Sequence, residues 1–180
     1  FASQEYLAGL LERNGFACER FSGALTARQK DDAIARFRDR TPLLLSTESG
    51  GEGRNLQFCI TLINFDLPWN PMRIEQRIGR LHRIGQTRDV FIYNLSVRDT
   101  LEDQILELLE SKINMFELVI GEIEPILGYI SEDQEFDEIV LSLWTRSANP
   151  EELKAGFDRL GTELVTAREQ YLAARQLDRE

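Results

Sequence analysis

LLLSTESGGEGRNLQFCITLINF, residues 43–65, contains two unbroken apolar runs on either side of a glycine-rich segment. The runs LLLST (43–47) and CITLINF (59–65) show little alternation of apolar and polar residues. A strand with such a run suits a sheet that is buried on both faces, as parallel sheets are. The stretch therefore predicts two strands of a buried parallel sheet that are joined by a loop.

Strand and helix alternate at short spacing on both sides of this stretch. Such alternation is typical of a doubly wound α/β domain, which binds its ligands at the carboxyl ends of its strands. The other predicted elements are a helix over 3–15, a strand over 16–21, a helix capped by Thr26 and Gln29, a helix opened by Pro71 and a strand over 90–96.

After residue 97 the pattern changes to helices alone. Asp99 or Thr100 caps a long helix, and Asn149 with Pro150 begins the last one. The later helices carry apolar residues at near-heptad spacing, which predicts an antiparallel hairpin or small bundle. The alternative is a docking surface for another chain. A loop is expected around 125–132, and the apolar stripe of the long helix comprises Leu101, Ile105, Leu108, Leu109, Met115 and Phe116.

The sequence thus predicts an α/β domain over 1–98 and an all-helical extension over 99–180, and the charge divides at the same boundary. Of the formal net charge of −10, residues 1–98 contribute +3, from 14 Lys and Arg against 11 Asp and Glu. Residues 99–180 contribute −13, from 7 against 20. What matters for nucleic-acid binding is whether basic groups gather on one face, so the acidity of the whole chain leaves such binding open.

Composition limits the class of protein. With 42% hydrophobic, 9% aromatic and 29% charged residues, the 180-residue chain has the make-up of a folded domain. No apolar run approaches the ~18 residues of a bilayer span, so we expect a cytoplasmic protein with no membrane partner. Cys18 and Cys59 follow no metal-ligand spacing, so we expect reduced thiols and no metal site. The chain begins at Phe1 without room for a preceding strand, which indicates a piece of a longer polypeptide.

QRIGRLHRIGQ (76–86) places arginines, glutamines and the single histidine around two glycines. If the helix opened by Pro71 continues through it, Gln76, Arg80 and Arg83 stand at i, i+4 and i+7 on one face. Planar guanidinium groups donate two hydrogen bonds to phosphate oxygens, so this face suits a phosphate ligand. The alternative is a surface helix whose arginines pair with neighbouring carboxylates. The apolar face that would anchor the helix consists of Ile74, Ile78 and Leu81.

STESGGEGRNLQ (46–57) directly follows a predicted strand. Its glycines Gly50, Gly51 and Gly53 allow backbone N–H groups to approach an anion closely. The segment is not a Walker A loop, because the required Gly-Lys dipeptide occurs nowhere in the sequence. It is interpreted as a phosphate-contacting loop, with an ordinary glycine loop as the alternative.

In order and spacing, three segments together resemble motifs V and VI of Swi/Snf-type ATP-dependent translocases in helicase superfamily two. They are LLLSTESGGEGRNLQ (43–57), LINFDLPWNP (62–71) and QRIGRLHRIGQ (76–86). The last two are especially similar to the bacterial RapA-like branch. The resemblance covers roughly residues 1–120, whereas residues 121–180 match no motif.

The resemblance implies a RecA-like fold and a specific division of labour. In the family, ATP and Mg²⁺ are held mainly by a first RecA-like lobe, and a second lobe completes the site. This chain then corresponds to the second lobe with a helical extension, and its partners are the first lobe of the same polypeptide and the backbone of double-stranded DNA. The isolated chain is expected to be inactive. RNA polymerase is a further partner suggested by the RapA-like wording, and a bacterial protein would be nucleoid-associated.

The resemblance also assigns functions to individual residues. Arg80 and Arg83 correspond to the catalytic arginines of motif VI, and Gln76 corresponds to a residue that positions the nucleotide or couples it to motif V. Gly53 and Asn55 fall on the nucleotide-facing part of motif V. The expected contacts with the nucleic-acid backbone are Gly23, Arg28, Thr47, Gly50 and Gly51.

Other polar and aromatic residues near these motifs are interpreted as structural. DLPWNP (66–71) is expected to form a rigid turn with Trp69 packed against it, and His82 is given no catalytic function. Arg77 departs from the family, in which alanine is frequent at this position.

Two rival functions remain open from the sequence. One is a non-catalytic interaction module whose acidic helices bind a protein such as RNA polymerase. The other is a lobe of an RNA helicase.

Overall fold

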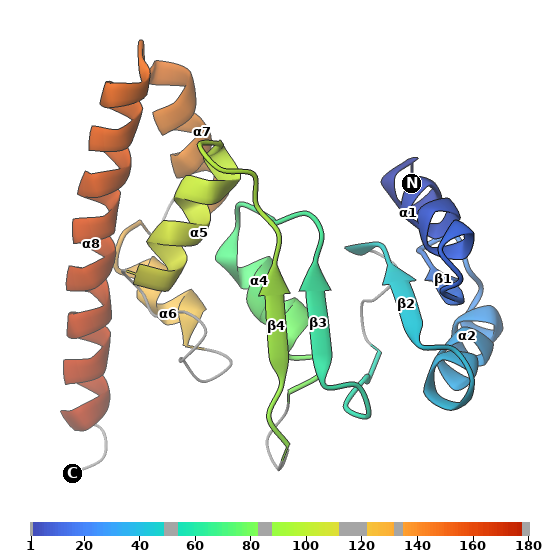
Figure 1. The fold of residues 1–180 in the computed structure, drawn as a ribbon. Helices are drawn as coiled ribbons and strands as arrows, with labels where there is room; N and C mark the ends of the chain where they lie inside the picture. Colours follow the sequence, from blue (N-terminus) through green and yellow to red (C-terminus); the bar gives the residue numbers. More distant parts are fainter. Residues whose placement is uncertain (1, 49–53, 83–87, 112–121, 132–134, 178–180) are drawn as a thin grey trace. The chain divides into compact units, whose positions relative to one another are not determined.

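The computed structural model describes residues 2–48, 54–82, 88–111, 122–131 and 135–177 (Figure 1). The chain divides into two compact units, Phe1–Ile60 and Thr61–Glu180, which are described separately. The first unit contains α1 (Ala2–Arg13), β1 (Cys18–Phe21), α2 (Ala27–Asp39) and β2 (Leu43–Ser46). The second contains β3 (Thr61–Asn64), α4 (Pro71–Ile78), β4 (Phe91–Asn94), α5 (Leu101–Ser111), α6 (Ile123–Gly128), α7 (Phe136–Arg146) and α8 (Pro150–Leu177).

The first unit is built around one β-α-β unit. Strands β1 and β2 pair in parallel, and the register runs from Cys18 opposite Leu43 to Phe21 opposite Ser46. Helix α2 connects them and begins with the predicted capping box, in which Thr26 accepts a bond from the backbone of Gln29 and the Gln29 side chain accepts one from the backbone of Thr26. Parallel pairing brings the carboxyl ends of both strands to the same edge.

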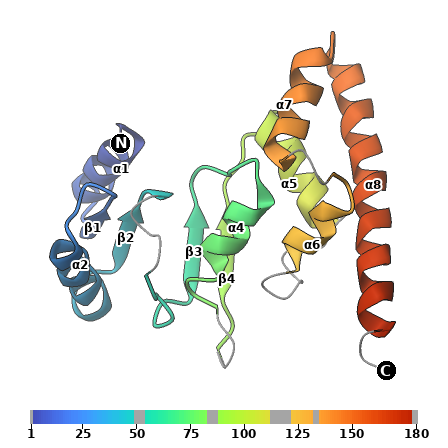
Figure 2. The same cartoon turned by 180° about the vertical axis from the view of Figure 1, so that it is seen from behind.

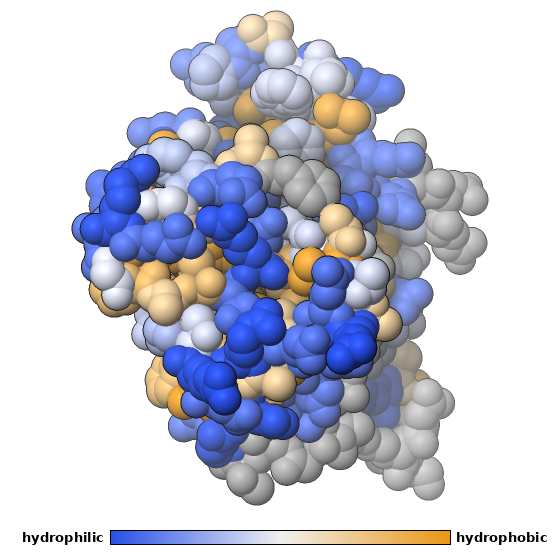
Figure 3. Space-filling view, turned by 90° about the vertical axis from the view of Figure 1, so that its right-hand side faces the viewer, coloured by the Kyte–Doolittle hydropathy of each residue, from blue (hydrophilic) through white to orange (hydrophobic). Residues whose placement is uncertain are grey.

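The first unit buries few side chains completely. Ala8, Phe21 and Ala33 have exposed fractions of 1% or less, and the rings of Phe37 and Phe58 meet with their centroids 5.4 Å apart. Hydrophilic residues cover most of the face of this unit in Figure 3, with apolar side chains visible between them. The helices are therefore amphipathic in the ordinary sense, with one side on the strands and one side in water.

Electrostatic shifts in the first unit have local causes. Arg36 donates from Nε and Nη2 to the two carboxylate oxygens of Glu19, at 2.9 and 2.8 Å, and these bonds hold the pKa of Glu19 below its usual value. Partial burial raises the pKa of Cys18. The raised pKa disfavours the thiolate form of Cys18, which is the form that a nucleophilic cysteine requires.

The second unit repeats the β-α-β arrangement. Strands β3 and β4 pair in parallel from Thr61 opposite Phe91 to Asn64 opposite Asn94, and α4 connects them. As predicted, α4 has Pro71 at its first position, and the Asn70 side chain caps it by accepting from the backbone N–H of Met72 at 3.0 Å. Figure 2 shows α4 over one face of the strand pair.

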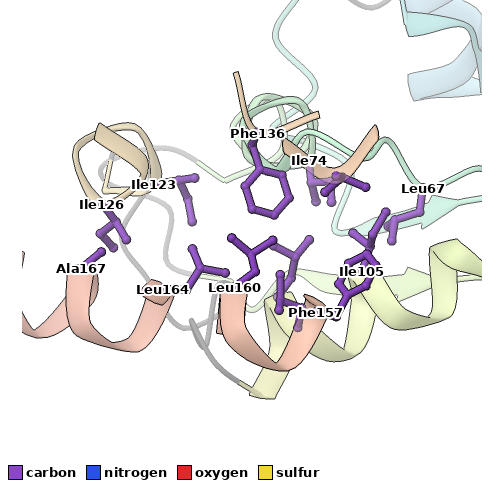
Figure 4. Close-up of a cluster of buried hydrophobic side chains, with 13 residues drawn as sticks. Leu67, Ile74, Ile105, Ile123, Ile126, Phe136, Phe157, Leu160, Leu164 and Ala167 are labelled. Carbon is purple, nitrogen blue, oxygen red and sulfur yellow. The ribbon is translucent and has the colours of Figure 1, made fainter. Parts of the chain in front are cut away.

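A single hydrophobic core holds the second unit together (Figure 4). Ile74 of α4, Ile105 of α5 and Leu164 of α8 are each completely buried in it. The core thus contains side chains from both sides of the predicted boundary between residues 98 and 99. That boundary does not coincide with a gap in the packing, and the division into 1–98 and 99–180 stays a prediction about domains. The other buried members are Leu67, Leu108, Leu109, Ile123, Ile126, Phe136, Val140, Phe157, Leu160 and Ala167.

The acidic helices pack on one another, as the heptad-like spacing predicts. Helices α7 and α8 run side by side in opposite directions (Figures 1 and 2). Asn149 caps α8 by accepting from the backbone N–H of Glu152 at 2.8 Å. Gly156 marks a close approach, since a Cβ there would lie 3.1 Å from Leu143 Cδ2. None of the helices in the described ranges has the length and apolar character needed to cross a membrane.

The structure corrects the sequence prediction in two places. Where a loop was expected around 125–132, the short helix α6 forms, because Ile123 and Ile126 share a face that is buried in the core. The prediction that the strands LLLST and CITLINF are buried on both faces is wrong. Leu43, Leu44 and Leu45 of β2 are only half-buried, and Ile63 of β3 is 55% exposed, since α4 lies over only one face of the β3–β4 pair. Met115 and Phe116 of the predicted apolar stripe lie outside the described residues.

The overall class is confirmed: parallel strands and helices alternate in the first part, and helices alone follow. Among the described residues, each unit contains one parallel strand pair, β1 with β2 in the first and β3 with β4 in the second.

Candidate functional site

The carboxyl edge of the β1–β2 pair gathers several of the predicted nucleic-acid contacts. Thr47, immediately after β2, donates its backbone N–H to the carbonyl of Phe21 at 2.9 Å. The exposed Gly23 lies in the turn that follows β1, and the exposed Arg28 lies in the first turn of α2. Because parallel strands end at the same edge, the structure brings these three residues to one side of the first unit.

Gln4 stabilises this edge. Its side-chain amide donates to the carbonyl oxygens of Phe21 at 3.2 Å and Leu45 at 2.6 Å, so one side chain of α1 ties the ends of both strands. Backbone carbonyls at a strand end otherwise need a partner from outside the sheet. Gln4 thus keeps in place the strand ends from which Gly23 and Thr47 follow.

Arg54, which follows the glycine-rich segment, is bound to helix α2. Arg54 forms an ion pair with Asp31 of α2 and donates to the carbonyl of Ala27 at 3.5 Å. The Asn55 side chain makes a local turn, accepting from the backbone N–H of Gln57 at 3.0 Å and donating to its side chain at 3.2 Å. Asn55 is exposed, and its nucleotide-facing function stays a prediction.

Four of the predicted site residues cannot be placed. Gly50, Gly51, Gly53 and Arg83 lie outside the described residues.

The helix that carries motif VI is anchored as predicted on its apolar side. Ile74 is completely buried, Leu81 is 3% exposed, and Ile78 packs against the core. Gln76 is exposed and Arg80 is half-buried. Packing of the apolar face in the core fixes the rotation of the helix about its axis. The polar residues of the motif lie on its other side.

The α-helix itself is shorter than predicted, because it ends at Ile78 with Gly79 as its C-cap. Hydrogen bonding nevertheless continues past this point. Arg80 donates its backbone N–H to the carbonyl of Arg77 at 3.3 Å, and His82 donates to that of Ile78 at 2.9 Å. Gly79 also has helical torsion angles, so the backbone continues to coil beyond α4. Arg80 therefore lies about one helical turn after Gln76.

A polar network that the sequence interpretation missed joins this helix to the strands. Arg77 donates from Nη1 to the side-chain oxygen of Asn64 at 3.0 Å, and Asn64 donates to that of Asn94 at 2.8 Å. Asn64 and Asn94 are the last residues of β3 and β4. The available signal was an asparagine near the end of each predicted strand, in LINF and in IYNL, together with the unusual arginine at position 77.

The structural interpretation of the DLPWNP turn is supported. Pro71 starts α4 and is buried, and Trp69 packs edge-on against Trp144 of α7, with ring centroids 6.3 Å apart. The Asp66 carbonyl accepts a bond from Arg77 at 2.8 Å. These contacts explain the presence of Asp66, Trp69 and Pro71 without assigning any of them a catalytic function.

Comparison with known proteins relates these sites to a family. Residues 2–85 match the model of the helicase conserved C-terminal domain. The chain is 48% identical over 159 residues to the uncharacterized ATP-dependent helicase YqhH of Bacillus subtilis (strain 168), and the match covers 88% of this chain and 28% of that protein. It is 34% identical over 168 residues to the RNA polymerase-associated protein RapA of Proteus mirabilis (strain HI4320), a match that covers 84% of this chain and 17% of the relative.

Among solved structures, the chain is similar to the C-terminal part of the Fun30 ATPase domain. The TM-score is 0.52 and the sequence identity 31%, and the match covers 57% of this chain and 34% of that one. Of the YqhH and RapA relatives, by contrast, the chain spans less than a third of the length.

Proposed function

We propose that the chain belongs to the helicase conserved C-terminal domain family, in the Swi/Snf-type branch of superfamily two, and that it is the second half of an ATP-driven translocase. Residues 1–98 form the second RecA-like lobe, and residues 99–180 form its helical extension. The intact cytoplasmic protein hydrolyses ATP, moves along double-stranded DNA and associates with the nucleoid.

The observation that carries this proposal is the placement of Gln76 and Arg80. The core-facing side of this helix is buried, whereas Gln76 is exposed, and the half-buried Arg80 follows about one turn further along the chain. An amide and a guanidinium so arranged can donate together to the oxygens of a phosphate. In our proposal Arg80 and Arg83 stabilise the negative charge that develops on the γ-phosphoryl oxygens, and Gln76 orients the nucleotide.

The nucleic-acid contacts are assigned to the carboxyl edge of the first unit. In our proposal Gly23 meets the DNA backbone there through its main-chain N–H, Thr47 through its side-chain hydroxyl, and Arg28 supplies a positive charge; Gly50 and Gly51 extend this surface. Backbone contacts hold the duplex without selecting a sequence, as a motor that steps along any DNA requires.

ATP and Mg²⁺ are assigned mainly to the first RecA-like lobe, since this sequence has no Walker A loop. Within the described ranges, no three His, Cys, Asp or Glu side chains are grouped so that they could hold a metal ion. The donors present here, Gln76 and Arg80, fit a triphosphate, whereas they do not fit a cation. Nucleotide contacts are also assigned to Gly53 and Asn55, on the resemblance of their segment to motif V.

This division of labour predicts that the isolated 180-residue chain does not hydrolyse ATP. The reason is that its residues complete a site whose nucleotide-holding half lies in the first lobe. Turnover of the purified chain, checked for folding by circular dichroism, is measured with and without duplex DNA. Hydrolysis well above background that duplex DNA stimulates would refute the proposal.

The nature of the nucleic acid is tested on the full-length protein. We expect duplex DNA to stimulate ATP hydrolysis more strongly than single-stranded DNA or RNA at equal nucleotide concentration. Salt should weaken the stimulation, because backbone contacts release counterions. Stronger stimulation by RNA would instead support the RNA helicase alternative.

A second candidate function rests on the name of one relative, which describes it as associated with RNA polymerase. In this alternative the acidic helices of residues 99–180 bind a protein partner such as RNA polymerase, and the lobe is a non-catalytic scaffold. The scaffold predicts no loss of ATP hydrolysis when Arg80 is replaced, so the two candidates give opposite results in the same assay.

A further inference from the structure

A buried polar network connects the ends of two strands. Asn64 is 1% exposed and stands opposite Asn94 in the parallel register. Its amide nitrogen donates to the side-chain oxygen of Asn94 at 2.8 Å, and its oxygen accepts from Arg77 Nη1 at 3.0 Å. Leaving either polar atom of a buried amide without a partner is costly, so the network constrains the side chains that it joins.

Arg77 fastens the last turn of α4 to this network. Besides Asn64, its Nη1 donates to the carbonyl oxygen of Asp66 at 2.8 Å and lies 3.7 Å from the Asp66 carboxylate. The Arg77 side chain is only 16% exposed. A charged donor makes stronger bonds than a neutral one, and one guanidinium here holds both the end of β3 and the loop that follows it.

The anchored turn is the one from which Arg80 projects. The carbonyl of Arg77 accepts the backbone N–H of Arg80 at 3.3 Å, and Gly79 lies between them. Glycine restricts the backbone least of all residues, so this turn depends on contacts outside itself for a fixed direction. The apolar side supplies one such contact through Leu81, and Arg77 supplies the other.

We propose that Arg77, Asn64 and Asn94 form a positioning network that holds Arg80 in register for ATP hydrolysis. The inference rests on the proposed function, since it assigns the network to the same site. None of the three residues touches the nucleotide in this account. They act through the direction of the turn, and misplacement of a catalytic group by about 1 Å can cost roughly a hundredfold in rate.

The test is a double-mutant cycle in the full-length protein, measured by single-turnover ATP hydrolysis so that very slow variants remain quantifiable. Arg77→Met keeps the length of the side chain and removes the guanidinium. It is expected to lower the hydrolysis rate by about 10- to 100-fold with little change in KM for ATP. When Arg80 is already alanine, Arg77→Met should lower the rate no further, because there is no arginine left to position.

A conservative variant separates positioning from folding. Asn64→Asp keeps an acceptor for Arg77, and the Asn94 amide can turn over to donate to the new carboxylate, so the rate should stay within about threefold of wild type. Asn64→Leu removes both bonds of Asn64 but leaves the bond from Arg77 to the Asp66 carbonyl, so it should lower the rate by no more than Arg77→Met does. Arg73→Met is the control, since it makes the same change at an exposed position on the same helix and is expected to leave the rate unchanged.

The outcomes distinguish this inference from the proposed function. If Arg80→Ala leaves hydrolysis unchanged, the proposed function itself fails. If Arg80→Ala abolishes hydrolysis while Arg77→Met has no effect, or lowers the rate by the same factor with and without Arg80, the positioning network is refuted. Should Arg77→Met not fold, Asn94→Ala removes only the outermost bond, and its smaller loss must likewise vanish when Arg80 is alanine.

Discussion

Replacing Arg80 with alanine in the full-length protein is expected to lower kcat for ATP hydrolysis by about 10³- to 10⁵-fold, the range found for arginines that act across a phosphoryl-transfer site. The physical reason is the negative charge that builds on the γ-phosphoryl oxygens as the bond to the leaving group breaks. A preorganised guanidinium stabilises that charge more in the transition state than in the ground state, so the loss falls on kcat.

The accompanying change in KM for ATP is expected to be small. The proposed site holds the nucleotide mainly through the first lobe, so removal of Arg80 leaves most ground-state contacts intact. Steady-state hydrolysis with saturating duplex DNA gives both constants. Arg73→Ala is the control, because Arg73 is an exposed arginine on α4, the helix that precedes Arg80. Equal activity of Arg80→Ala and Arg73→Ala would contradict a catalytic function for Arg80.

The second large effect concerns stability. Leu164 of α8 is completely buried in the core of the second unit, so Leu164→Ala leaves a cavity there. We expect the free energy of unfolding to fall by about 2–5 kcal/mol. Since folded domains are stable by only about 5–15 kcal/mol, this loss is a large fraction of the total. Urea denaturation followed by circular dichroism measures it.

This variant also tests the link between the helical extension and the catalytic helix. Ile74 of α4 lies in the same core as Leu164, so weaker packing of α8 should reduce the stability of α4 as well. Leu177→Ala on the same helix is the control, since Leu177 is 74% exposed and its truncation should change stability little. A Leu164→Ala variant as stable as Leu177→Ala would show that α8 is not part of a common core.

Local signals in the sequence were sufficient for three of the helix starts. The capping box of Thr26 and Gln29, Pro71 at the first position of α4 and Asn149 before α8 were all confirmed. These predictions succeed because a helix start depends on residues within one turn of each other.

Features that depend on contacts between distant residues were not predictable. Helix α6 forms because its apolar residues meet α8 in the core, which no local pattern indicates. The Arg77 network joins residues 13 and 30 positions apart, from Arg77 to Asn64 and from Asn64 to Asn94. For the candidate site, the sequence supplied the residues and helix α4, which Arg80 follows, whereas the anchoring of the last turn of α4 emerged only from the three-dimensional structure.

The most direct test of the account is a structure of the full-length protein with ADP and aluminium fluoride bound in place of the transferring phosphate. The account predicts that the Arg80 guanidinium lies about 3 Å from a fluoride or a phosphate oxygen, at hydrogen-bond distance. An Arg80 side chain directed away from the nucleotide, and paired instead with carboxylates of the acidic helices, would contradict it.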